Sequence, residues 1–336
     1  MVASLHRGDR IPDFVAPTDK GLPTRFYAVA GGRPTLILFA TADQAADVHR
    51  LLDQLAPDVL AATDVILIRS GPVASGTGFE RVFVDEGARI RSSFKLPAES
   101  CQALALSPNL RLLAPPSASP LEAASELSDL LRDALQQEEA TVVGSHAPVL
   151  LIPDVLDSRR CQELVQLWQA GGHEATGIEA SLDGARSEFL DDHAKRRQDH
   201  IVGDRAITNR LTTTLGRRVL PEVARAFSYR ADRFEGFKIA CYDGEQDGFF
   251  RSHRDNLSPS TAHRRFALTL NLNDDYDGGC LRFPEFAPLL YRPAPGEALL
   301  FSCAHLHEVT PVERGRRYTL LSFLFSASEG KARQDR

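Results

Sequence analysis

The first 140 residues alternate short apolar runs with amphipathic stretches. Residues 34–39 and 65–68 are rich in leucine, isoleucine and valine, which predicts two buried strands. Residues 43–55 repeat apolar side chains at helical spacing, with Asp43 placed as the N-cap. Strands that alternate with helices predict an α/β layer fold. Further elements of this kind are strands over 81–84 and 103–106 and a closing helix over 121–135.

The pattern changes after residue 145. Short apolar runs are separated by glycine, proline and aspartate at intervals of about ten residues, which is typical of an all-β sandwich or barrel. Residues 265–273, for example, alternate in polarity and end in the acidic turn 274–279. Helical stretches over about 158–170 and 204–228 are expected to buttress this β domain.

A short polar stretch, 137–146, ends in small residues and marks the expected domain boundary. The sequence therefore predicts an α/β domain over 1–140 and a β domain over 145–330. A chain of 336 residues is long enough for two separate cores.

Composition narrows the class of protein. The chain is 43% apolar and 25% charged, as is typical of a globular protein, and no apolar run is long enough to span a membrane. The N-terminus lacks the apolar stretch of a signal peptide, so we expect a cytoplasmic protein. The five scattered cysteines form neither a disulfide framework nor a zinc pattern. A net charge of -6 argues against a nucleic-acid partner.

Four residues in the second half carry the candidate chemistry. His253 and Asp255 are two positions apart, so on a strand both side chains point to the same side and can hold one metal ion. With His307 from a distant strand they complete a set of two histidines and one carboxylate, which suits ferrous iron. Arg317, ten residues further on, can bind a carboxylate through its guanidinium fork.

Each of the last two positions has a rival. His305 shares the strand face of His307, so parity does not choose between them, although the run after His307 and the offset to Arg317 favour His307. Arg316 competes with Arg317, but neighbouring residues on a strand face opposite ways and only one of them can point inward.

These residues are part of a family resemblance that extends over residues 145 to about 327. This region resembles the prolyl 4-hydroxylase-type branch of the Fe(II)/2-oxoglutarate dioxygenases, whose fold is a double-stranded β-helix, or jelly roll. The resemblance implies that His253, Asp255 and His307 bind iron, and that Arg317 binds the distal carboxylate of 2-oxoglutarate.

The cosubstrate pocket matches the family less closely. Tyr242 stands where some members use a tyrosine to hydrogen-bond 2-oxoglutarate. Where some relatives carry a second tyrosine on the strand after the His-x-Asp, this chain has Asn271, and where many have a tyrosine three residues before the first ligand it has Phe250. We therefore expect a pocket completed differently, with Asn271 among the cosubstrate contacts.

The resemblance also implies the reaction and its cofactors: Fe(II), 2-oxoglutarate and O2, with ascorbate as a further candidate. Succinate and carbon dioxide would be released as the substrate is hydroxylated. We expect a small-molecule substrate, because the loops at 174–203 and 256–264 are long enough to form a lid. The alternatives are hydroxylation of a protein or peptide side chain, and a non-catalytic metal-binding interaction protein.

In the first domain, residues 5–14 and 84–94 resemble segments of the peroxiredoxins, which have a thioredoxin-like fold. That family places its peroxidatic cysteine just after the first long strand, but residues 39–49 contain no cysteine, and Cys101 lies elsewhere. Without the thiolate there is no peroxidase. We interpret the domain as a degenerate redoxin that serves packing, homodimerisation or substrate recognition.

The basic run Lys195–Arg197 allows two interpretations. A charge run is more often a solvated turn than a functional surface. The alternative is a rim that meets an anionic substrate.

Overall fold

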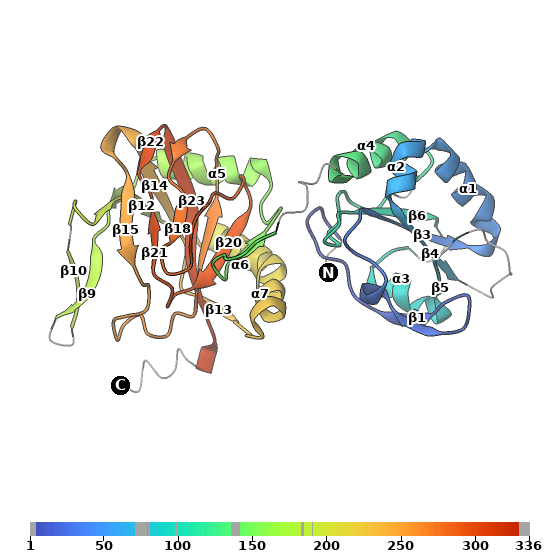
Figure 1. The fold of residues 1–336 in the computed structure, drawn as a ribbon, viewed down its shortest axis with the longest axis horizontal. Helices are drawn as coiled ribbons and strands as arrows, with labels where there is room; N and C mark the ends of the chain where they lie inside the picture. Colours follow the sequence, from blue (N-terminus) through green and yellow to red (C-terminus); the bar gives the residue numbers. More distant parts are fainter. Residues whose placement is uncertain are drawn as a thin grey trace. The chain divides into compact units, whose positions relative to one another are not determined.

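The computed structural model describes residues 5–70, 79, 81–97, 100–117, 119–135, 142–182, 185–189 and 191–328. The chain divides into two compact units, Met1–Thr141 and Val142–Arg336 (Figure 1). The predicted polar boundary at 137–146 falls at this division, although its residues 137–141 lie outside the described part of the chain.

The first unit is built on a four-stranded sheet in the order β5-β4-β3-β6. β3, β4 and β5 run parallel, and β6 is antiparallel to β3. All four strands lie at the predicted positions: β3 Thr35–Thr41, β4 Asp64–Ser70, β5 Val82–Val84 and β6 Gln102–Leu106. A short hairpin, β1 Val15–Pro17 with β2 Pro23–Arg25, precedes them.

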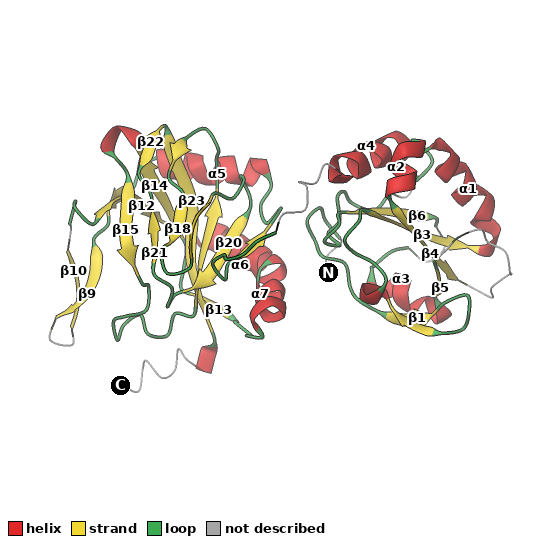
Figure 2. Cartoon of the chain, in the orientation of Figure 1, coloured by secondary structure: helices red, strands yellow, loops and turns green. Residues whose placement is uncertain are grey.

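This sheet is buried on both faces, which explains why its strands read as continuous apolar runs. On β3, Ile37 and Phe39 enter one core, while Leu36 and Leu38 enter the other. Helices cover the sheet (Figure 2). They are α1 Ala45–Gln54, α2 Pro57–Ala62, α3 Arg89–Ser93 and α4 Ala124–Leu135. The thioredoxin-like assignment of this unit stays a prediction.

The prediction that Asp43 caps the first helix is wrong. Asp43 lies inside a 3-10 turn, Ala42–Gln44, that precedes α1. The turn begins at Thr41, whose backbone N–H donates to the side chain of Gln44 at 3.0 Å. Asp43 accepts a hydrogen bond from the Thr41 hydroxyl instead.

The second unit is a jelly roll of antiparallel strands in two main sheets. The larger sheet has the order β7-β20-β16-β23-β14-β12-β8, with β13 also paired to β23, and the smaller one has the order β11-β15-β21-β18-β19. The strands of the larger sheet are β7 Leu150–Ile152, β8 His173–Ala175, β12 Gln198–Ile201, β13 Arg233–Phe234, β14 Lys238–Asp243, β16 Phe266–Asn271, β20 Ala298–Ser302 and β23 Arg316–Phe325. Those of the smaller sheet are β11 Lys195–Arg196, β15 Phe249–His253, β18 Leu281–Phe283, β19 Ala287–Tyr291 and β21 His307–Val309. Two further pairs are β9 Ile178–Leu182 with β10 Ala185–Phe189, and β17 Asp277–Gly278 with β22 Val312–Arg314.

Strand alternation gives the larger sheet two buried faces. On β16, Leu268 and Leu270 pack into the core that faces the helices, while Ala267 packs into the core shared with the smaller sheet. Thr269 and Asn271 follow Ala267 at intervals of two and share its side of the strand. The same alternation on β14 and β23 puts polar side chains between the two sheets, where the site lies.

Three helices cover the outer face of the larger sheet. α5 Ser158–Gln169 and α6 Arg205–Arg218 begin at aspartates, Asp157 and Asp204, whose carboxylates accept hydrogen bonds from backbone N–H groups of the first turn. The helix predicted over 204–228 is two helices, α6 and α7 Leu220–Phe227, because Pro221 in the first turn of α7 has no backbone N–H with which to continue α6. Among the residues described in either unit, no helix has the length and apolar character needed to cross a bilayer.

Candidate metal centre

The smaller sheet brings two of the predicted ligands together. His253 ends β15 and His307 begins β21, and the two residues are direct partners in the register of these strands. Asp255 lies just beyond β15, where its backbone N–H donates to the Cys303 carbonyl at 3.0 Å. The expected pairing of His253 and Asp255 on one strand is therefore replaced by a strand end and the turn that follows it.

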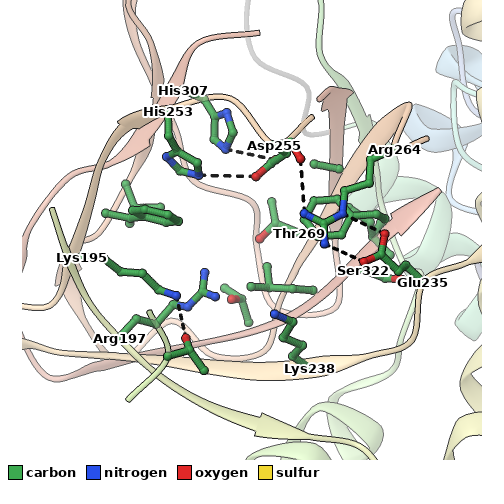
Figure 3. A pocket seen from close by; sticks show the side chains of 18 of the residues that line it. Lys195, Arg197, Glu235, Lys238, His253, Asp255, Arg264, Thr269, His307 and Ser322 are labelled. Atoms are coloured by element: carbon green, nitrogen blue, oxygen red, sulfur yellow. Dashed lines mark hydrogen bonds and ion pairs between the residues drawn. The ribbon is translucent and has the colours of Figure 1, made fainter. Parts of the chain in front are cut away.

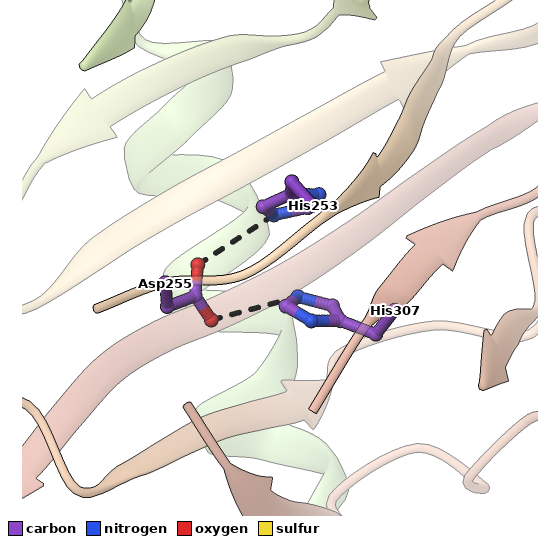
Figure 4. Close-up of side chains that lie close together, drawn as sticks. All are labelled: His253, Asp255 and His307. Atoms are coloured by element: carbon purple, nitrogen blue, oxygen red, sulfur yellow. Dashed lines mark ion pairs between the residues drawn. The ribbon is translucent and has the colours of Figure 1, made fainter. Parts of the chain in front are cut away.

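The three side chains converge on one point (Figure 4). The Nε2 atom of His253 lies 3.5 Å from Oδ1 of Asp255, and Nε2 of His307 lies 3.5 Å from Oδ2. One ligand atom from each residue falls within 4.8 Å of the other two. Two imidazoles and a carboxylate on one side of an ion form the donor set that leaves open positions on ferrous iron.

Backbone carbonyls orient both imidazoles. Nδ1 of His253 lies 2.7 Å from the Arg251 carbonyl, and Nδ1 of His307 lies 3.0 Å from the His305 carbonyl. A carbonyl only accepts, so each Nδ1 carries the proton and donates it, which leaves the Nε2 lone pair for a metal. These bonds fix the tautomer that metal ligation needs.

Burial and mutual interaction set the charges of the group. Burial lowers the pKa of His307 to about 4, so this imidazole is neutral at pH 7. Burial alone would raise the pKa of Asp255, but His307, His253 and Arg264 lower it to about 2. The carboxylate is therefore ionised when the imidazole of His307 is neutral, which is the combination a divalent cation requires.

The rivals in the sequence are placed elsewhere. His305 lies in the turn before β21, where its ring meets the edge of Phe286 at 4.9 Å between centroids. Arg316 is exposed and forms an ion pair with Asp243 at 2.8 Å. Arg317, its neighbour on β23, points inward and is only 2% exposed.

A cavity of about 1060 Å³ opens beside the three residues, and its wall includes Arg317 and Tyr242. The Arg317 guanidinium lies 5.4 Å from the centre of the Tyr242 ring. Among the residues that the structure describes, the Nε of Arg317 and the hydroxyl of Thr319 are buried without a hydrogen-bond partner. A buried guanidinium that faces a cavity is suited to bind an anion there.

Comparisons with known proteins agree with this geometry. The sequence model of the 2OG-Fe(II) oxygenase superfamily matches residues 237–325, which contain all three converging residues and Arg317. The second unit therefore contains a 2OG-Fe(II) oxygenase domain.

Two PKHD-type hydroxylases are similar to this chain over about half of its length. A PKHD-type hydroxylase from Delftia acidovorans is 28% identical over 201 residues, covering 55% of this chain and 80% of that protein. One from a Synechococcus strain is 25% identical over 185 residues, covering 53% of this chain and 78% of that protein. The oxygenase unit is thus a 2-oxoglutarate-dependent non-haem iron enzyme that uses Fe(II), 2-oxoglutarate and O2.

Solved structures with a similar chain trace include two prolyl hydroxylases. The enzyme from Trichoplax adhaerens, solved with a hypoxia inducible factor peptide fragment, has a TM-score of 0.44 and 20% identity over 55% of this chain and 86% of its own. A Pseudomonas putida prolyl-4-hydroxylase has a TM-score of 0.41 and 19% identity over 54% of this chain and 93% of its own.

The position of Asn271 in the oxygenase unit does not support the predicted cosubstrate contact. Its Nδ2 donates to the carbonyls of Asn273 at 2.7 Å and Pro293 at 2.9 Å, and its Oδ1 accepts from Tyr276 at 3.1 Å. These hydrogen bonds use the Asn271 amide to join the turns, and Asn271 does not line the cavity. Thr269, two residues earlier on the same face of β16, lines the cavity in its place.

The basic run Lys195–Arg197 is not a solvated turn. β11 pairs with β15, so Lys195 and Arg197 turn toward the cavity while Arg196 faces outward. Arg196 forms an exposed ion pair with Asp247 at 3.4 Å. Arg197 donates to Tyr242 at 3.3 Å and pairs with Asp199 at 2.7 Å.

Sequence reasoning missed two cavity residues that strand parity indicates. Thr319 is two positions after Arg317 on β23, and Lys238 is four positions before Tyr242 on β14. Both share the inward face of a residue already chosen, and both line the cavity. Extending the alternation from Arg317 and Tyr242 along each strand identifies them.

Proposed function

We propose that the oxygenase unit holds Fe(II) with His253, Asp255 and His307, binds 2-oxoglutarate through Arg317, and hydroxylates a small molecule. The convergence of the three donor atoms beside a cavity that contains a buried guanidinium carries this proposal. Iron and 2-oxoglutarate, when bound, supply an oxidative decarboxylation that yields succinate, carbon dioxide and an oxygen atom for the substrate.

The protein's own residues bind and orient the reactants. The two imidazoles donate from Nε2 because carbonyls hold both Nδ1 protons. Arg317 offers its fork to the distal carboxylate of 2-oxoglutarate, and Tyr242 stacks beside it as the second cosubstrate contact. Phe250, Phe301 and Val309 line the cavity near the ligands, so they exclude water from the reacting carbon.

The size of the cavity supports a small-molecule substrate. Pockets for small ligands have volumes of roughly 300–1000 Å³. A cavity of about 1060 Å³ therefore has room for 2-oxoglutarate and a compact second molecule. Hydroxylation of a peptide side chain is the alternative, and a substrate screen must include proline-containing peptides.

For the first unit we propose a degenerate redoxin without peroxidase activity. Cys101 is the single cysteine before residue 142, and burial raises the pKa of its thiol. A protonated thiol is a poor nucleophile toward peroxide. We propose that this unit serves packing, homodimerisation or substrate recognition. The oligomeric state of the full chain, measured by sedimentation, tests homodimerisation.

Succinate release tests the catalytic proposal without knowledge of the substrate. Purified protein with Fe(II), ascorbate and 2-oxoglutarate in air should form succinate slowly, and a true substrate should accelerate this several-fold. His253→Ala should abolish the succinate. His305→Ala is the matched control, because it removes an imidazole two residues from His307 without touching the three donors. Equal loss in both variants, or none in His253→Ala, would contradict the proposal.

A further inference from the structure

The strand pair that brings the two histidines together ends at the metal centre. His253 is the last residue of β15 and His307 the first of β21, so both ligands stand at the end of this pair. Asp255 lies beyond it, and the segment before His307, residues 303–306, also lies outside the strands. Contacts other than the strand pairing must therefore help to fix the distance between these two segments, which meet at the three donor atoms.

On the side of the cavity, the position of Asp255 is restrained by Arg264. Nη1 of Arg264 donates to the main-chain carbonyl of Asp255 at 3.3 Å, and the carboxylate of Glu235 holds the same guanidinium at 2.6 Å (Figure 3). A backbone hydrogen bond of 3.0 Å, from the Asp255 N–H to the Cys303 carbonyl, links the two segments directly.

Arg254 and Glu285 form a second link between the segments. Nη2 of Arg254 lies 2.5 Å from Oε1 of Glu285, and Nη1 lies 3.1 Å from Oε2. Two parallel contacts of this kind make a bidentate fork, which fixes the orientation of both groups. Arg254 also donates to the main-chain carbonyl of Ala304. We call the Arg254–Glu285 pair the clamp.

Both ends of the clamp are next to an imidazole ligand. Oε2 of Glu285 accepts a hydrogen bond from the backbone N–H of Leu306 at 2.7 Å. Leu306 directly precedes His307, and Arg254 directly follows His253. The clamp therefore joins the residue after one histidine to the residue before the other.

The clamp is too exposed to contribute much to the stability of the fold. The side chains of Arg254 and Glu285 are 31% and 35% exposed, and water weakens ion pairs of this kind. A metal site is more sensitive to small displacements, because the distances from its ligands must match the ion to within about 0.2 Å. Groups that orient metal ligands commonly change metal affinity by roughly 10- to 100-fold. The effect of the clamp should therefore appear in metal binding.

We propose that Arg254 and Glu285 are positioning residues of the metal centre, and that the clamp sets the separation of the two segments and thereby the affinity for the divalent ion. This inference rests on the proposed function of the same site. It gives a role to Arg254, which stands between two ligands in the sequence although a guanidinium has no lone pair to offer a metal.

The affinity for Zn(II), measured on the full-length protein by competition with a chromophoric chelator, tests the proposal without turnover. Binding at the site is the part that His253→Ala abolishes. Glu285→Gln should weaken this binding about tenfold. Arg254→Gln should weaken it by a similar factor, whereas the loss of a positive charge beside a cation would by charge alone tighten it. Changes in the same direction therefore distinguish positioning from electrostatics.

A double variant and a control complete the test. Arg254→Gln combined with Glu285→Gln should bind Zn(II) about as weakly as either single variant, because each substitution alone already opens the clamp. Asp277→Asn is the matched control: it neutralises another carboxylate that pairs with a surface arginine, Arg314, at 2.6 Å, and it should leave the affinity unchanged. Unchanged affinity in both clamp variants, changes of opposite sign, or an equal loss in Asp277→Asn would overturn the proposal.

Urea unfolding of the metal-free protein separates positioning from folding. Both clamp variants should unfold at nearly the wild-type urea concentration, because the pair is exposed. A lowered unfolding midpoint with unchanged Zn(II) affinity would make the clamp a pair that stabilises the fold, and the proposal would fail.

Binding of 2-oxoglutarate separates this inference from the proposed function. In a metal-dependent titration by calorimetry at saturating Zn(II), Glu285→Gln should bind 2-oxoglutarate as the wild type does, because Arg317 lies on β23 of the other sheet. If the wild type binds Zn(II) but no 2-oxoglutarate, the proposed function fails while the Zn(II) affinities still decide on the clamp. If the wild type binds both and the clamp variants keep its Zn(II) affinity, only the inference fails. If His253→Ala leaves Zn(II) binding intact, both fail.

Discussion

His253 and His307 face each other across β15 and β21, with their ring centres 4.2 Å apart. They are far apart in the sequence and become neighbours only through the pairing of these strands. Asp255 completes the group from the turn after β15, at 3.5 Å from each imidazole. The site is thus a product of sheet register, and its chemistry depends on a few side chains whose removal has separable effects.

Arg317→Met should raise the KM for 2-oxoglutarate about 100-fold, which corresponds to the loss of about two charge-assisted hydrogen bonds. Arg317→Lys should give an intermediate value, because an ammonium keeps the charge but loses the fork. The measurement is succinate release against 2-oxoglutarate concentration. Arg316→Met, which removes an exposed neighbour, is the control, and an effect as large as that of Arg317→Met would argue against our assignment.

Asp199→Asn should destabilise the oxygenase unit by about 3 kcal/mol, because it leaves the buried guanidinium of Arg197 without its counter-charge. Asp199 has no exposed side-chain surface, and Arg197 has 9%. Urea unfolding followed by the fluorescence of Trp168, the single tryptophan, reports on this unit. Asp247→Asn is the matched control, because the Asp247 carboxylate is 80% exposed and pairs with Arg196. Its loss should lower the free energy of unfolding by no more than about 0.5 kcal/mol. Equal effects would show that burial does not set the strength of the Arg197 pair.

His307 should make the stability of the metal-free protein depend on pH. Its pKa is lowered from 6.5 to about 4 by burial, so between these values the unfolded chain binds more protons than the folded one. The free energy of unfolding then falls as pH decreases through this window, by about 1 kcal/mol per pH unit. His307→Gln should remove this part of the slope. An unchanged slope would mean that His307 is already charged in the folded protein.

The oxygenase unit should work without the first unit. A fragment that begins at residue 142 contains every residue assigned to iron and 2-oxoglutarate, and has its own cores. We expect its 2-oxoglutarate affinity to equal that of the full chain, measured by the same metal-dependent titration. A folded fragment that had lost this affinity would assign the first unit a part in the site.

The sequence was most informative where strand parity and ligand chemistry coincide. Strand parity indicated that only one of Arg316 and Arg317 could point inward, and the family resemblance favoured Arg317. The structure buries Arg317, while Arg316 reaches Asp243. The preference for His307 over His305 came from spacing, and His307 lies with His253 and Asp255.

Other features depend on information that a local pattern does not contain. Thr269 and Asn271 share one strand face, and only the pairing of β16 decides which of them reaches the cavity. Lys195–Arg197 resembles a solvated turn until β11 is paired with β15, which turns two of its three charges inward. The break between α6 and α7 was readable at Pro221, but the amphipathic pattern continues across it.

Anaerobic titration of the metal-free protein with Fe(II) and 2-oxoglutarate tests the central claim most directly. A weak visible charge-transfer band should appear when both are present. His253→Ala should abolish the band, Arg317→Met should shift it to much higher 2-oxoglutarate concentrations, and His305→Ala should leave it unchanged. Iron bound by the wild type with no band at saturating 2-oxoglutarate would contradict the assignment of this cavity.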